Sequence, residues 1–488
     1  MYRTVAQLNN LMGQLAGFFP QIVTRLRMPE PSVEGRTVYA LRLRAGGGGA
    51  RRGVLLVGGT HSRELMNPDL LVELAVDLVV SCVTGNDVTL GRRTWPAGDI
   101  KVILETLDLY LLPCSNPDGR IYVMNVDDMW RKSRRDNPGT PCDGVDLNRN
   151  LDFMWGVTQG QTSCSPCSDV YAGPSAFSEP ETRNVRHLLD TYRIDCFADV
   201  HSYSELILYP WGHAPTQTTD PSQRFTSLPT GTCQPIGRPH QEYMPPQDLQ
   251  RFQTVAQRIV DAIAAVRGRA YTPQSSLGLY ATTGTHSDYA YSRHIANPAL
   301  RKVYGYTFET GPWMGNVPDS FHPPDPAPIK EEAESGLIAL IQQCICAIEL
   351  IGARFLGRED EVGVLRRVRD QVFATTPAGR DWIALYERVQ TPLTAVVLED
   401  EGLARRAADV LARAGDVFAD EEAAVPPDVV DEALTILRQL EDRAPTDEVR
   451  ADLRSLRPVL EQAADRSTSD IVERLMARGP QTGGQTAE

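Results

Sequence analysis

The chain has 488 residues, an ordinary globular composition and a formal net charge of −14, so its length allows two to four domains. The negative charge argues against nucleic-acid binding as a main role. No apolar run of about 18 residues or more is present, which excludes a typical transmembrane helix, and residues 1–21 lack the pattern of a signal peptide. We therefore expect a cytoplasmic protein that does not associate with membranes.

Apolar periodicity predicts alternating strands and helices over the first 355 residues. The helix-like segments are residues 1–20, 65–83, 179–192, 249–267 and 331–355. The strand-like segments are residues 37–44, 54–57, 106–112 and 205–209, together with two runs that end at His201 and Glu309. Strands that alternate with helices are typical of α/β proteins.

The most informative motif follows the apolar run 54–57 and reads Gly58-Gly59-Thr60-His61-Ser62-Arg63-Glu64. A histidine and a carboxylate three residues apart at a strand end can bind one metal ion, and both are ligands that Zn²⁺ accepts. A single histidine beside an apolar run is more often a hydrogen-bonded core residue. The metal interpretation therefore needs further ligands.

Two other strand ends supply a third ligand candidate and an acid/base candidate. His201 ends one apolar run, and Glu309 lies near the end of another. Sites in open α/β sheets gather at the carboxyl ends of strands. A catalytic zinc takes three protein ligands and leaves one position open, so these strand ends predict a hydrolytic metal centre.

Together with other motifs, these residues resemble the zinc metallocarboxypeptidase family of the carboxypeptidase A/T type over about residues 1–355. The additional motifs are Asn116-Pro117-Asp118-Gly119, Trp130-Arg131-Lys132-Ser133-Arg134, Gly144-Val145-Asp146-Leu147-Asn148-Arg149-Asn150, His201-Ser202-Tyr203-Ser204, Tyr280 with Gly284, and Phe308-Glu309. The resemblance implies an α/β fold with a mixed, mostly parallel sheet flanked by helices. It also implies a peptide substrate with a free C-terminal carboxylate.

The resemblance implies one Zn²⁺ per chain, bound by His61, Glu64 and His201. Asp146 would hold the His61 ring from behind, as a second acceptor usually does for a ligating histidine. Glu309 would act as general base and then as general acid.

The same resemblance assigns substrate contacts to several polar side chains. Arg131 would stabilise the oxyanion, and Asn148 and Arg149 would hold the terminal carboxylate, for which the planar guanidinium of arginine is well suited. Tyr280 would close over the bound end. Arg63 would contact the backbone one residue upstream, or serve only as a structural ion-pair residue.

The pocket for the terminal side chain is expected to be polar. By resemblance it is lined by Asp199, Leu208, Gly212, Ser275, Leu279, Thr282, Thr285, Ser287 and Thr307. Ser287 takes the base position, and Asp199 brings a potential charge. Since unpaired buried polar groups are costly, a polar or basic terminal residue fits better than a large apolar one.

Two other functions compete with a carboxypeptidase. One is a zinc amidohydrolase that acts on cell-wall peptides or acylated amino acids, which would share the chemistry and differ in its pocket. The other is a catalytically dead binding protein, which the presence of every expected catalytic residue disfavours. The products released from simple peptides and from muropeptides would separate the two enzymes.

The nine cysteines give conflicting signals. The resemblance places Cys142 and Cys167 where secreted relatives carry a disulfide, whereas a reducing compartment would keep them as thiols. The spacing of Cys164 and Cys167 is typical of a metal site, but no second pair accompanies it.

Residues 213–247 form an insertion that is either a binding loop or a passive surface segment.

The C-terminal part differs in composition from the rest. Residues 1–357 are expected to form the catalytic domain, 358–478 a bundle of about five short helices broken at Pro377, Pro392, Pro426-Pro427 and Pro445, and 479–488 a disordered tail. The alternating charges of the bundle indicate a solvated surface. Binding of a protein partner or self-association through this segment is the alternative.

Overall fold

The computed structural model describes residues 2–47, 51–158, 160–213, 233, 242–345, 351, 372–420, 422–444, 447–477 and 479–480. The chain divides into two compact units, Met1–Cys344 and Ile345–Glu488. The boundary expected at residue 357 and nearly all of the expected tail lie outside the described residues.

An eight-stranded sheet forms the centre of the first unit. Its strands are β1 (Val23–Arg27), β2 (Tyr39–Leu43), β3 (Arg52–Gly58), β6 (Leu107–Leu112), β7 (Ile194–His201), β8 (Leu206–Tyr209), β9 (Thr272–Ser275) and β10 (Tyr304–Glu309), in the spatial order β1-β2-β6-β3-β7-β10-β8-β9. The four central strands, β6-β3-β7-β10, are parallel to one another. The fold class is therefore the mixed, mostly parallel α/β arrangement expected from the sequence.

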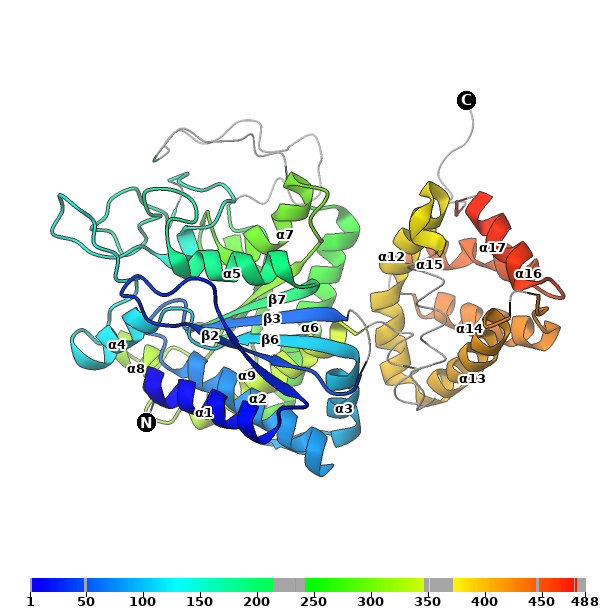
Figure 1. Ribbon diagram of the computed structural model, residues 1–488, viewed down its shortest axis with the longest axis horizontal. Coiled ribbons are helices and arrows are strands. Elements are labelled where there is room, and N and C mark those ends of the chain that lie inside the picture. The colour runs from blue at the N-terminus through cyan, green and yellow to red at the C-terminus, as the bar shows by residue number, and fades with distance from the viewer. Residues whose placement is uncertain are drawn as a thin grey trace. The chain divides into compact units, whose positions relative to one another are not determined.

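Helices cover both faces of the sheet (Figure 1). They are α1 (Val5–Phe18), α2 (Met66–Thr84), α3 (Ala97–Thr106), α4 (Pro117–Asn125), α5 (Pro180–Thr191), α6 (Pro246–Arg267), α7 (His286–Ala296), α8 (Val317–Phe321) and α9 (Ala327–Gln343). In Figure 1, α5 and α7 lie above the sheet, and α1, α2 and α9 lie below it. A small hairpin of β4 (Val88–Leu90) and β5 (Arg93–Trp95) stands apart from the sheet.

The central strands are apolar because both of their faces are buried, as is usual in parallel sheets. Every residue of β6 and of β7 is buried. Their register places the strand ends together, since Glu309 pairs with His201 and Val200 pairs with Gly58. The segments that follow β3, β7 and β10 therefore leave the sheet at one edge, and these segments contain the predicted site residues.

Two helix boundaries differ from the sequence prediction. The helix expected over 331–355 begins earlier, and its continuous run ends at Gln343. It ends there because the amide of Cys344 donates to Ile341 O, 3.0 Å away, and this tighter bond is typical of a final helical turn. The helix expected over 179–192 is α5, which begins at Pro180 with Glu179 as its N-cap residue and ends at Thr191.

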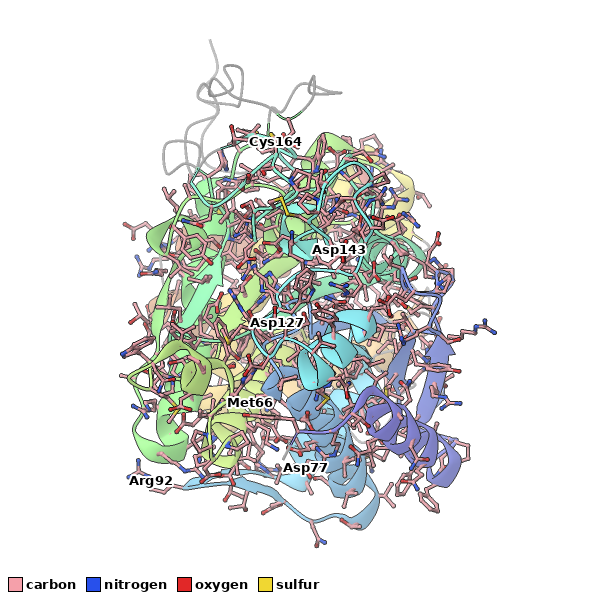
Figure 2. The ribbon with its side chains drawn as sticks, turned by 90° about the vertical axis from the view of Figure 1, so that its left-hand side faces the viewer. Met66, Asp77, Arg92, Asp127, Asp143 and Cys164 are labelled. Atoms are coloured by element: carbon pink, nitrogen blue, oxygen red, sulfur yellow. A yellow bond between two sulfur atoms is a disulfide. The ribbon has the colours of Figure 1, made fainter. Side chains whose placement is uncertain are left out.

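Three disulfides cross-link the first unit and join Cys142 to Cys167, Cys164 to Cys233 and Cys196 to Cys344. Cys164 lies among loops at the opposite end of this unit from Asp77 and Arg92 (Figure 2). The pair with metal-like spacing is thus divided between two disulfides, so Cys164 and Cys167 do not form a metal site. Most of the 213–247 insertion lies outside the described residues.

The described part of the second unit is helical. Its helices are α12 (Pro377–Glu399), α13 (Glu401–Phe418), α14 (Pro427–Asp442), α15 (Asp447–Ser455), α16 (Arg457–Glu461) and α17 (Thr468–Ala477). The break expected at Pro392 is wrong, because α12 continues through that residue. Two apolar clusters, one around Val430 and one around Leu385, form its core.

No described helix of the chain has the length and apolar character needed to span a membrane.

Candidate active site

The three predicted metal ligands meet at the edge of the sheet. Nδ1 of His61 lies 2.8 Å from Oε1 of Glu64, and Nδ1 of His201 lies 3.0 Å from Oε2 of the same carboxylate. The two Nδ1 atoms are 3.0 Å apart, and all three side chains are buried. The structure therefore brings His61, Glu64 and His201 into one cluster that could hold a metal ion.

The chemistry of these donors fits a cation. Nε2 of His61 faces Oδ1 of Asp146 at 3.1 Å, and Nε2 of His201 lies 2.7 Å from Oδ2 of Asp199. A carboxylate only accepts hydrogen bonds, so the His61 ring, which is aligned with Asp146, is expected to carry its proton on Nε2. The two Nδ1 atoms face each other and the Glu64 carboxylate, a donor set suited to a cation between them. Zn²⁺ accepts this donor set.

Asp146 connects the metal cluster to Arg131. Its Oδ2 accepts bonds from Nε and Nη2 of Arg131 at 3.1 and 3.0 Å, while its Oδ1 faces His61. Although burial favours the protonated acid, Arg131 holds the pKa of Asp146 well below its usual value. Asp146 therefore stays ionised and orients both His61 and Arg131, the role that the resemblance implied.

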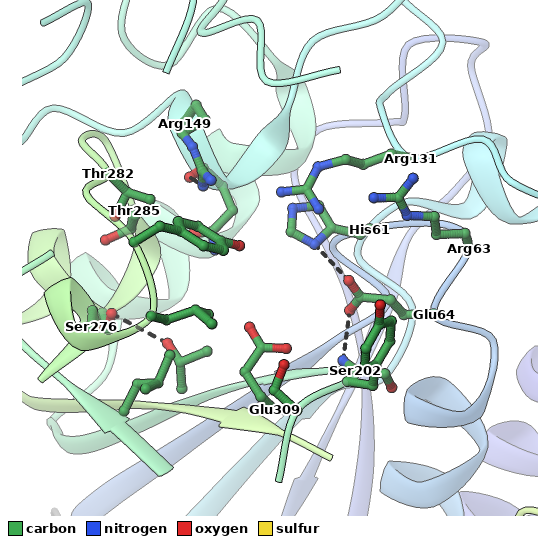
Figure 3. A pocket seen from close by; sticks show the side chains of 18 of the residues that line it. His61, Arg63, Glu64, Arg131, Arg149, Ser202, Ser276, Thr282, Thr285 and Glu309 are labelled. Atoms are coloured by element: carbon green, nitrogen blue, oxygen red, sulfur yellow. Dashed lines mark hydrogen bonds and ion pairs between the residues drawn. The ribbon is translucent and has the colours of Figure 1, made fainter. Parts of the chain in front are cut away.

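Glu309 reaches the cavity from the end of β10. It lines the same cavity as His61 and Arg131, and Figure 3 shows its carboxylate pointing into the open space. Burial, together with the charge of Glu64, raises the pKa of Glu309 to about 8. A carboxyl group with a raised pKa is suited to exchange protons near neutral pH.

The cavity has a volume of about 200 Å³. Arg149, on the short helix η1 (Leu147–Arg149), lies across it from Glu64 (Figure 3). Asn148, on the same helix, also lines the cavity. Gly284 lets the neighbouring loop pack on η1, because its φ is +68° and a Cβ there would lie 2.4 Å from the carbonyl oxygen of Arg149. Tyr280, 39% exposed, lines the cavity from that loop.

The side of the cavity opposite the metal cluster is rich in hydroxyl groups. Its lining there comprises Ser276, Thr282, Thr285, Ser287 and Thr307, with the apolar side chains Leu208 and Leu279. The hydroxyl of Thr307 donates to that of Ser287 at 3.3 Å. Figure 3 shows Ser276, Thr282 and Thr285 on the side opposite His61 and Glu64. Six of the nine expected lining residues are present in this cavity.

The structure corrects the expected place of Asp199. Its side chain is fully buried and does not line the cavity. Gly212 and Ser275 do not line the cavity either. Although burial alone would raise it, His201 and His286 lower the pKa of Asp199. The carboxylate is thus occupied by the two imidazoles behind the metal cluster and brings no charge to the pocket.

The structure adds residues that the sequence analysis did not assign. Tyr203 and Phe321 line the mouth of the cavity, and their ring centroids lie 5.0 Å apart. The guanidinium of Arg63 lies 4.5 Å from the centroid of the Phe321 ring. Tyr203 could have been predicted from the sequence, because it belongs to the motif that contains His201. Phe321 could not, because no motif includes it.

The strand ends of the mixed α/β sheet carry a His-Glu-His cluster and a carboxylate with a raised pKa. Two arginines, Arg131 and Arg149, line the same cavity. Together these features define a metal-dependent hydrolase. The chain belongs to the zinc carboxypeptidase family, whose model matches residues 8–337, and it is a zinc metallocarboxypeptidase that uses one zinc ion.

Similar proteins agree with this assignment. Carboxypeptidase B of Astacus astacus is 33% identical over 294 residues, covering 59% of this chain and 81% of that protein. Carboxypeptidase A4 of Mus musculus is 29% identical over 310 residues, which is 63% of this chain and 62% of the mouse protein. The match thus spans less than two thirds of the mouse enzyme.

Solved structures show the same fold. Carboxypeptidase A from Helicoverpa armigera aligns with a TM-score of 0.51 at 25% identity, over 70% of this chain and 74% of that one. Thrombin-activatable fibrinolysis inhibitor aligns with a TM-score of 0.56 at 22% identity, over the same shares of the two chains.

Proposed function

We propose that this carboxypeptidase removes C-terminal residues with polar, uncharged side chains from peptides. The observation that supports this specificity is the hydroxyl-rich side of the cavity next to Asn148 and Arg149. An exopeptidase needs a cation for the terminal carboxylate beside a pocket for the terminal side chain, and the cavity offers both.

Different residues of the chain bind the substrate, transfer the proton and stabilise the oxyanion. Arg149 and Asn148 bind the terminal carboxylate, and Tyr280 covers the bound end. When bound, zinc acts as a Lewis acid on the scissile carbonyl and lowers the pKa of water. Glu309 accepts a proton during attack and returns it to the leaving amine. Arg131 faces the oxyanion with a fixed positive charge, which is worth about 3–4 kcal/mol in comparable sites.

The pocket distinguishes between side-chain classes. A large apolar residue would offer no partner to the Thr282 hydroxyl or to the O–H of Ser287, whose oxygen already accepts from Thr307, and each buried polar group left unpaired costs about 1–3 kcal/mol. A basic residue would need a negative charge in the lining, and Asp199, the residue expected to supply it, lies behind His201. Polar, uncharged residues satisfy the hydroxyls without such a charge.

N-acylated dipeptides with varied C-terminal residues test this proposal. The zinc-loaded enzyme should hydrolyse those that end in Ser, Thr, Asn or Gln with kcat/KM values at least about tenfold above those that end in Phe, Arg or Lys. A preference for arginine or phenylalanine would contradict the assigned specificity and leave the family assignment intact.

We also propose that the protein matures in an oxidising compartment rather than in the cytoplasm. Three disulfides support this, because such bonds persist where thiols are not continuously reduced. They occupy six of the nine cysteines. Alkylation of the denatured, unreduced native protein should therefore modify at most three, and all nine should react after reduction. Modification of more than three without reductant would contradict the proposal.

For residues 358–478 we propose a role in association with a second copy of the chain or with a protein partner. The segment lies beyond every residue of the active site, and its two apolar clusters give it a core of its own. Sedimentation of the full chain and of a chain ending at Gly357 tests self-association. The full chain should self-associate, and the shortened chain should not.

A further inference from the structure

A buried carboxylate and an additional imidazole lie behind the metal cluster, and no step of the proposed reaction uses them. Asp199 is on β7 and His286 is the first residue of α7, and both are buried. Oδ2 of Asp199 lies 2.7 Å from Nε2 of His201 and 3.0 Å from Nδ1 of His286. This oxygen is not aligned as the acceptor of either ring N–H, so both are close polar contacts and not hydrogen bonds.

Asp199 lies on the outer side of His201 as Asp146 lies on the outer side of His61, although only the Asp146 contact is aligned as a hydrogen bond. Each carboxylate approaches the ring nitrogen that faces away from the metal cluster. Such partners fix the tautomer and orientation of a ligating histidine, and their removal typically costs 10–100-fold in metal affinity. Asp199 thus directs the lone pair of His201 Nδ1 toward the cluster.

The surroundings of the two carboxylates differ. Asp146 is held by the guanidinium of Arg131. Asp199 has no arginine at this distance among the described residues. It accepts a bond from the hydroxyl of Thr60 at 2.9 Å and contacts His286. The imidazole of His286 therefore lies beside Asp199 where the guanidinium of Arg131 lies beside Asp146.

His286 also reaches the carboxylate-binding residue. Its backbone amide donates to Oδ1 of Asn148 at 2.8 Å, and its Nδ1 lies 3.1 Å from the same oxygen. These contacts determine which way the Asn148 amide points, because Oδ1 is occupied by His286. The donor group Nδ2 is left on the opposite side, 3.4 Å from Nε2 of His201.

We propose that Asp199 and His286 are positioning residues that connect the metal ligand His201 with the substrate-binding Asn148. Asp199 sets the ring of His201, and His286 sets the amide of Asn148 while it contacts Asp199. The proposal has two halves. The substrate half, that His286 positions Asn148, rests on the proposed role of Asn148. The metal half, that Asp199 positions His201, is independent of any substrate.

Zinc affinity of the full chain tests the metal half. Asp199→Asn keeps the shape of the side chain and removes its charge, so competition with a chelator should give a zinc dissociation constant at least about tenfold higher. The matched control is Asp195→Asn on the same strand. Asp195 is a buried carboxylate paired with Arg52 and Arg301, away from the cluster, and this change should lower stability without altering zinc affinity.

Kinetics of two His286 variants test the substrate half and supply evidence if Asp199→Asn does not fold. With saturating zinc, His286→Phe should raise KM for peptides with a free carboxylate at least about fivefold, with a smaller change in kcat. His286→Gln, which again offers a donor, should restore part of the loss. A role in folding alone would not produce this division between KM and kcat.

Three results would overturn the inference. They are a zinc affinity of Asp199→Asn within twofold of the parent, an equal loss of zinc in Asp195→Asn, or an unchanged KM in His286→Phe. The parent enzyme separates this failure from failure of the proposed function. If the parent itself does not discriminate free from amidated peptides, the assigned role of Asn148 is wrong, and the zinc measurements still decide the role of Asp199.

Discussion

At the scale of single residues, the active site depends on where protons are held. Asp146 and Asp199 approach the outer nitrogens of His61 and His201, so both inner nitrogens are free to bind a metal. The sequence predicted the ligands and the role of Asp146, because each follows a strand end or lies in a recognisable motif. It could not predict the place of Asp199, since strand alternation alone does not say which neighbour a buried carboxylate contacts.

The role of Glu309 is tested by Glu309→Gln. The amide keeps the shape of the side chain and cannot accept the proton, so kcat should fall by about 10²–10⁴-fold, the usual contribution of a general base. Zinc content should stay at one per chain, because Glu309 is not among the ligands. Steady-state kinetics and metal analysis of the same preparation check both. A kcat within tenfold of the parent would show that another group carries the proton.

At the scale of elements, the site is built where three parallel strands end and loops from distant parts of the chain meet them. The sequence predicted these strands because their apolar runs are unambiguous. It missed β9 and α7, among others, because residues 272–285, around and between these two elements, are rich in Thr, Ser and Gly and have weak periodicity. Their positions depend on tertiary contacts such as the approach of Gly284 to Arg149, which no local pattern specifies.

The start of α5 gives a pH-dependent prediction. Glu181 is buried in its first turn, where one carboxylate oxygen accepts a bond from the Val33 amide at 3.0 Å and the other has no partner. Burial, with a contribution from the charge of Glu179, raises the pKa of Glu181 from 4.5 to about 8. The folded state thus binds a proton that the unfolded state releases between these values. This contribution to stability is complete below pH 4.5 and is lost as the pH rises through 8.

Glu181→Gln should remove that dependence. The free energy of unfolding of the parent should contain a component that decreases between about pH 5 and pH 8, and the variant should lack it. Urea denaturation of both proteins across this range measures the difference. Equal slopes in parent and variant would mean that Glu181 ionises normally in the folded protein.

At the scale of the whole molecule, the chain consists of two units with separate cores. Every proposed catalytic and binding residue lies in the first unit, within the range matched by the family model. The change of composition led to an expected boundary at residue 357, whereas the two compact units divide between Cys344 and Ile345. The sequence did not predict that α12 would continue through Pro392, because the packing of a helix can outweigh the bond that a proline removes.

Removal of the second unit tests this division. A chain that ends at Gly357 should fold, bind zinc and hydrolyse a dipeptide with kcat/KM within about tenfold of the full chain, or about 1.4 kcal/mol in transition-state terms. Circular dichroism and metal analysis would confirm that the shortened chain is folded and loaded. A folded, zinc-loaded and inactive protein would show that the helices shape the active site.

The central claim is that Arg149 and Asn148 bind a free terminal carboxylate beside the zinc cluster. The most direct measurement compares kcat/KM of the zinc-loaded enzyme on one peptide with a free and with an amidated C-terminus. Amidation removes the charge that Arg149 should bind, at a cost of about 3 kcal/mol, so the amidated peptide should be cleaved at least about 100-fold less efficiently. Equal cleavage of the two peptides would contradict the account.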